Sequence, residues 1–117
     1  MVYFIRAKSY FKYAKDLFKD LYNLMDEPEK ARAKAKEVFK IALKAVWALS
    51  QVTSSDKKPE FEEIYQVALK GMDDFQAKRI KEIKELLFSD KSLKSQEIIE
   101  LVEETLKIVE QTLKPIL

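Results

Sequence analysis

Apolar residues recur at helical spacing from the start of the chain. Over residues 3–25, alanines return every seven residues and bulky apolar pairs fall between them. Such a stripe is typical of a helix with one buried face, and the lysines between its members fall on the solvated face. The pattern therefore predicts a long amphipathic helix over residues 3–25.

A second helix is predicted to follow a short turn. Asp26 is placed to cap this helix, and Pro28 fits its first turn, where the missing N–H costs little. A seam of mostly small residues runs from Ala31 to Val52 at spacings of three and four. Because the turn is short, we expect the two helices to pack antiparallel.

The second helix also carries a further apolar face beside its seam. Its members are Phe39, Leu43, Val46 and Trp47. Either another helix of the same chain or a second subunit must cover this face, and the spacing favours neither. A two-fold dimer is the usual form of self-association, so these residues are the candidate interface.

The rest of the chain predicts two more helices. A loop-like segment at residues 53–59 precedes an apolar pattern over residues 61–87, which keeps its phase across Gly71 and so favours one continuous helix over two helices kinked there. A turn at residues 89–92 precedes the last helix, over residues 93–113. One glycine and three prolines argue against an all-β fold, which needs many turn residues. We predict an all-α, up-and-down antiparallel bundle of four main helices in one domain over residues 1–117.

The composition removes most catalytic chemistry. The chain has no histidine and no cysteine, which excludes imidazole and thiolate metal sites and the Ser-His and Cys-His catalytic pairs. A single glycine excludes glycine-rich phosphate loops. Adjacent acidic pairs, such as those at residues 62–63 and 103–104, point in different directions on a helix and are interpreted as surface charge. We therefore expect no enzyme activity, cofactor or metal.

Charge is unevenly distributed although the formal net charge is only +2. Residues 1–58 carry a net +6 and residues 59–117 a net −4, and lysines accumulate over residues 30–44 and 78–84. Five basic residues are the candidates for contacting phosphate: Lys40, Lys44, Lys78, Arg79 and Lys81. The alternative is a lysine-rich solvated face without a ligand. No apolar run is long enough to span a bilayer, so we expect a cytoplasmic protein without membrane contact, and the abundance of Lys and Glu is compatible with a thermophilic source.

The first two helices resemble a known family. The alanine stripe of residues 7–17 and the segment over residues 31–49, with its Ala-Leu-Lys-Ala element at residues 42–45, are similar to the start of a HEPN domain, closest to the PaREP1-like archaeal branch. The resemblance covers residues 3–52 and implies a small, often dimeric helical bundle. Ribonuclease-active HEPN domains carry an Arg followed four to six residues later by a His, and this chain has none. The resemblance therefore implies a non-catalytic member.

Two functions follow from these observations. The first is a non-catalytic interaction protein, acting as a homodimer or as the helical partner of a nucleotidyltransferase-type protein through the second apolar face. The alternative is RNA or nucleotide binding through the lysine-rich helix faces.

Overall fold

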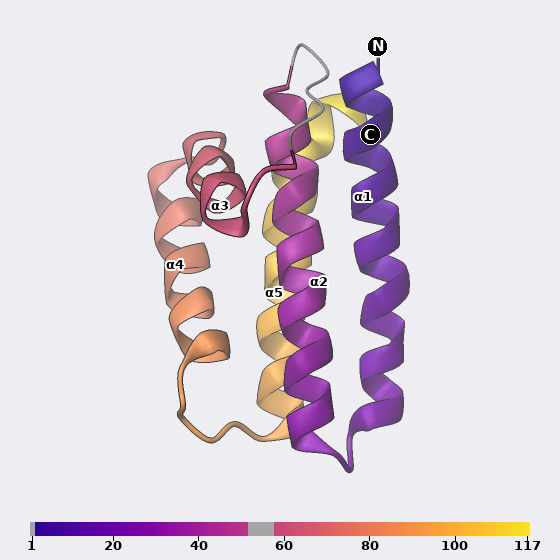
Figure 1. Ribbon diagram of the computed structural model, residues 1–117, viewed down its shortest axis with the longest axis vertical. Helices are drawn as coiled ribbons and strands as arrows, with labels where there is room; N and C mark the ends of the chain where they lie inside the picture. Colours follow the sequence, from indigo (N-terminus) through magenta and orange to yellow (C-terminus); the bar gives the residue numbers. More distant parts are fainter. Residues whose placement is uncertain (1, 52–57) are drawn as a thin grey trace.

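The computed structural model describes residues 2–51 and 58–117, and within these ranges all regular structure is helical (Figure 1). The elements are α1 (Val2–Lys19), the 3-10 helix η1 (Asp20–Leu24), α2 (Pro28–Leu49), α3 (Phe61–Lys70), α4 (Asp74–Phe88), α5 (Ser95–Leu113) and the 3-10 helix η2 (Lys114–Ile116). The all-α fold class is confirmed. Most of the loop expected at residues 53–59 lies outside the described residues. Across the two described ranges, no helix combines the length and apolar character needed to cross a membrane.

The central element of the molecule is α2, which has neighbours on both sides. It packs against α1, α3, α4 and α5, and α1 and α3 lie on opposite sides of it in Figure 1. Figure 1 shows α1, α2 and α5 running along the long axis, with α5 behind α2, while the short α3 lies between α4 and α2. Because α2 is covered on two sides, nine of its 22 residues are buried, and only a strip of this helix reaches solvent.

Small residues let the long helices approach closely. Ala7 and Ala14 of α1 and Ala35 and Ala42 of α2 have no exposed surface, as the seven-residue spacing predicts. Pro28 begins α2, where its missing N–H leaves no helix hydrogen bond unmade. The helical pattern predicted over residues 3–25 is divided between α1 and the 3-10 turn that follows it.

The helical stretch is interrupted at Gly71, so the expectation of one continuous helix over residues 61–87 is wrong, and the described residues form five α-helices rather than the four predicted. The backbone N–H of Gly71 bonds to the carbonyl of Ala68 at the end of α3. A capping box then starts α4: the Gln76 N–H donates to Asp73 Oδ1 at 2.7 Å, and the Asp73 N–H donates to the Gln76 side-chain oxygen at 3.2 Å. This reciprocal pair satisfies amides that are otherwise unpaired at a helix start, and it stabilises a new helix there.

The second apolar face of α2 is covered from within the chain. Phe39 and Leu43 have no exposed surface and Val46 has 3%, and Phe39 packs edge-on against Phe61 of α3 at a centroid distance of 6.3 Å. Only Trp47 is half-buried. Because α3 and α4 pack against α2, the chain itself covers Phe39, Leu43 and Val46, and of the four residues only Trp47 keeps substantial exposed surface. A subunit contact at Trp47 stays a prediction.

Candidate functional site

The exposed strip of α2 carries lysines whose ammonium groups lie over aromatic rings of neighbouring helices. Lys40 Nζ lies 5.4 Å from the ring centroid of Phe61 in α3, and Lys44 Nζ lies 4.9 Å from that of Tyr10 in α1. At such distances the electrons of a ring attract a cation. We call this surface the lysine–aromatic face. Its members are Lys36, Lys40, Lys44, Lys84, Tyr10, Phe61, Tyr65 and Phe88.

Three of these lysines meet at one ring, that of Phe88 at the end of α4. The ammonium nitrogens of Lys36, Lys40 and Lys84 lie 5.4, 5.8 and 6.0 Å from its centroid. The Phe88 ring is stacked on the ring of Phe61, with the centroids 6.0 Å apart and the planes inclined by 11°. The packing of α2, α3 and α4 therefore gathers, on one patch, lysines that are far apart in the sequence.

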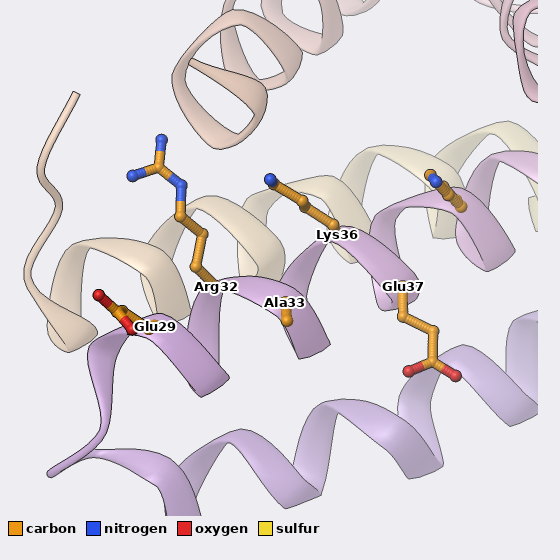
Figure 2. Close-up of a pocket in the computed structure, with 6 residues that line it drawn as sticks. Glu29, Arg32, Ala33, Lys36 and Glu37 are labelled. Carbon is orange, nitrogen blue, oxygen red and sulfur yellow. The ribbon is translucent and has the colours of Figure 1, made fainter. Parts of the chain in front are cut away.

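A shallow hollow of about 430 Å³ borders this patch. Its lining residues are Glu29, Arg32, Ala33, Lys36, Glu37 and Lys40. Figure 2 shows Arg32 and Lys36 extending from the same side of α2, whereas Glu37 points away from them. Glu37 pairs with Lys34 at 3.5 Å, so its carboxylate is directed away from Lys36.

One residue that lines the hollow, Arg32, binds backbone carbonyls at the end of α4. Arg32 donates through Nε to the carbonyl of Leu87 at 2.9 Å and through Nη2 to those of Leu86 at 2.7 Å and Ser89 at 2.6 Å, and Nη1 donates to the carbonyl of Lys91. The last carbonyls of a helix have no intrahelical partner. Arg32 therefore caps the C-terminus of α4 from α2, and its guanidinium is not available to an incoming ligand.

The charge of the molecule is polarised between its helices. Together, α1 and α2 carry eleven basic and three acidic side chains, a net +8, whereas α5 carries one basic and five acidic side chains, a net −4. Among the described residues only three of the eleven make an ion pair: Lys19, Lys30 and Lys34. The other eight have no carboxylate within salt-bridge distance in the described part of the chain, and three of them belong to the lysine–aromatic face.

The structure separates the five residues predicted to contact phosphate. Lys40 and Lys44 lie on the lysine–aromatic face, over rings of different helices. Lys78 and Lys81 are exposed on the outer side of α4. Arg79 is held by α5: its Nη2 donates to Glu104 Oε1 at 2.9 Å and its Nε to the other carboxylate oxygen. The hydrogen bond to Glu104 raises the pKa of Arg79, with burial opposing it.

The sequence alone offers little reason to single out Lys36 and Lys84 among the many lysines. Lys36 lies four residues before Lys40, and Lys84 lies four residues before Phe88, so each spacing places the two side chains on one helix face. These spacings are visible in the sequence. The meeting of the two helices at Phe88 is not, because it depends on the break at Gly71, which turns α4 back along α2.

Tyr65 closes one edge of the lysine–aromatic face. Its ring is 6% exposed and lies 4.7 Å from Lys84 Nζ. Burial raises the pKa of its hydroxyl above 10.0, and the negative charges of Glu62 and Glu85 raise it further. The hydroxyl therefore keeps its proton to a higher pH than that of a free tyrosine, and the neutral ring faces the ammonium group of Lys84.

The arrangement is suited to binding anions. In the described residues, no group of three or more acidic side chains is placed to hold a metal ion. The face offers ammonium donors beside half-buried rings, which is the chemistry of contact with phosphates and bases. Comparisons of the chain with models of known families, with curated proteins and with solved structures give no match.

Proposed function

We propose that this protein is a non-catalytic helical domain that binds single-stranded RNA through the lysine–aromatic face of α2 and its neighbours. The observation that carries the proposal is the gathering of Lys36, Lys40, Lys44 and Lys84 over four rings, without ion-pair partners in the described residues. Lysines that neutralise phosphates release condensed counterions, and this release drives association.

The spacing along α2 supports a strand laid along the helix. Lys36, Lys40 and Lys44 follow one another at four-residue intervals, which is about 6 Å of helix rise for each step. The side chains therefore form a row that can follow successive phosphates of an extended strand. Double-stranded RNA fits less well, because the row is a single line on one helix.

Aromatic side chains near this row favour RNA over an acidic protein. Trp47 lies three residues after Lys44 and is half-buried, and Tyr13 of α1, three residues after Tyr10, is 51% exposed. Bases stack on such rings, and stacking tolerates any sequence. An acidic peptide would use the lysines without needing the rings.

The proposal keeps the non-catalytic character that the sequence predicts. The chain has no histidine to complete the Arg-His pair of active HEPN ribonucleases. On this proposal, the helical pair that resembles a HEPN domain acts as a binding surface for RNA. The homodimer and the partnership with a nucleotidyltransferase-type protein stay predictions, and of the four residues assigned to them only Trp47 keeps substantial exposed surface.

The test is RNA binding by two variants of equal charge. The full chain, the double variant Lys36→Gln/Lys40→Gln and the control Lys78→Gln/Lys81→Gln are titrated into a fluorescent oligoribonucleotide without secondary structure, at low salt. We expect the first variant to lose about 10- to 100-fold in affinity, from two charge-assisted contacts, and the control to change little. Equal losses in the two variants, or no binding by the unaltered chain, would contradict the proposal.

A further inference from the structure

We infer that Lys36, Lys40 and Lys84 form a discrete site for one phosphate group, placed above the ring of Phe88. This inference deepens the proposed RNA binding and rests on it for the biological ligand. It names the point on the lysine–aromatic face at which a phosphate is held by several donors at once.

The geometry of the three ammonium groups carries the inference. All three lie within 6.0 Å of the same ring centroid, although Lys36 and Lys40 come from α2 and Lys84 from α4. Lys36 and Lys84 are half-buried, so packing restricts their stems, and the ammonium groups reach the same ring from two helices. A tetrahedral phosphate has oxygens in several directions and can accept from all three.

Three like charges on one patch also need a compensating anion. Cations held close together repel one another, and repulsion is stronger where burial lowers the effective dielectric constant. The rings of Phe88, Phe61 and Tyr65 offset part of this repulsion by cation–π attraction. A bound phosphate would offset it more fully.

The acidic residues around the patch leave it open to an anion. Glu37 pairs with Lys34, and Glu62 accepts from Gln66 at 3.0 Å. Glu85 is close enough to Tyr65 to affect its pKa, but it makes no ion pair with Lys84 among the described residues. No carboxylate in the described part of the chain therefore occupies the place we assign to phosphate.

Two kinds of phosphate could fill the site. One is a phosphodiester within an RNA strand, and the other is the terminal phosphate monoester of a strand or a nucleotide. The monoester carries more negative charge and one more free oxygen, so it satisfies three donors better. The affinities of two single-stranded oligoribonucleotides of the same sequence, one with and one without a 5′-phosphate, distinguish the two sources.

Direct evidence comes from titrating the full chain with inorganic phosphate at constant ionic strength. In each lysine, the NMR signal of the methylene group next to the ammonium nitrogen reports the binding. We expect the signals of Lys36, Lys40 and Lys84 to shift along one saturating curve, and those of Lys78 to shift weakly without saturating. Separate curves for the three lysines, or the same unsaturated behaviour as Lys78, would overturn the site.

Variants identify the contribution of α4. Lys84→Gln should weaken phosphate binding about tenfold, the loss of one charge-assisted hydrogen bond, whereas Lys78→Gln on the same helix should change it by less than about twofold. Lys84→Arg, which keeps the charge, shows whether charge rather than packing is responsible, and circular dichroism shows that each variant is folded. Unchanged affinity in folded Lys84→Gln would overturn the inference.

The two proposals fail in different ways. Saturating phosphate binding by the three lysines without RNA binding at low salt would leave the phosphate site and remove the RNA proposal. RNA binding that depends on Lys36 and Lys40 but not on Lys84 would keep the RNA proposal and remove the phosphate site. A preference for the 5′-phosphorylated oligoribonucleotide that disappears in Lys84→Gln would assign the site to the monoester.

Discussion

At the scale of single residues, Arg32 shows how one side chain determines the position of a helix. Its guanidinium joins α2 to the carbonyls of Leu86, Leu87, Ser89 and Lys91 at the end of α4. A planar guanidinium presents five donors in a fixed fork, which an ammonium group cannot reproduce. The lysine–aromatic face depends on this contact, because Phe88 lies within the segment that Arg32 holds.

We predict that Arg32→Ala lowers the free energy of unfolding by about 2–3 kcal/mol, since several hydrogen bonds from a charged donor are lost together. Arg32→Lys should retain only a small part of the stability that Arg32→Ala loses. Lys30→Ala is the matched control on the same helix, because its ion pair with Glu27 is exposed and is expected to contribute less than about 1 kcal/mol. Urea unfolding followed by circular dichroism measures all three, and equal effects of Arg32→Ala and Lys30→Ala would contradict the assignment.

We predict that Tyr65 makes stability depend on alkaline pH. Its pKa is raised in the folded protein by burial, and then by Glu62 and Glu85, so the unfolded chain loses the proton first. The contribution of the neutral ring is therefore complete below about pH 10 and is lost as the pH rises through the raised pKa. Above about pH 10, the free energy of unfolding of Tyr65→Phe should fall less steeply with pH than that of the unaltered chain. Parallel curves for these two proteins would show that Tyr65 does not titrate as described.

At the scale of elements, the break between α3 and α4 determines which residues meet. A carbon atom added at Gly71 would lie 3.2 Å from Val46 Cγ1, so the glycine allows the end of α3 to approach α2 closely. The capping box of Asp73 and Gln76 then starts α4. With one continuous helix, Phe61 and Phe88 would lie far apart and could not stack.

We predict that Asp73→Ala lowers the free energy of unfolding by about 1 kcal/mol, the usual contribution of an N-cap side chain. The neighbouring Asp74→Ala removes the same charge but no cap, so it should cost only a few tenths of a kcal/mol through the helix dipole. Thermal unfolding compares the two. A larger loss in Asp74→Ala would mean that the capping hydrogen bond of 2.7 Å does not stabilise the start of α4.

The sequence was sufficient to predict an all-α fold, but not the break between α3 and α4 or the places where the helices meet. The alanine seams of α1 and α2 follow from spacing alone, because a seven-residue recurrence has one simple explanation in a helix. The break at Gly71 was missed because the apolar phase continues through it, although the Asp-x-x-Gln spacing at residues 73–76 is a start signal. The coverage of Phe39 and the convergence on Phe88 depend on tertiary packing, which no local pattern encodes.

At the scale of the whole molecule, charge is unevenly distributed among the helices. The pair α1–α2 has a net charge of +8, and α5 has −4. Figure 1 shows α5 behind α2. Such a charge distribution steers an anionic strand toward one face and raises its rate of association at low salt.

The most direct test of RNA binding by this face is the salt dependence of the affinity of the full chain for a single-stranded oligoribonucleotide. If the four lysines of the face each neutralise one phosphate, the slope of log affinity against log salt concentration should be about −3, at about 0.7 for each contact. Lys36→Gln should make this slope shallower by about 0.7, and Lys78→Gln should leave it unchanged. A slope near zero, or one that Lys36→Gln and Lys78→Gln alter equally, would contradict the account.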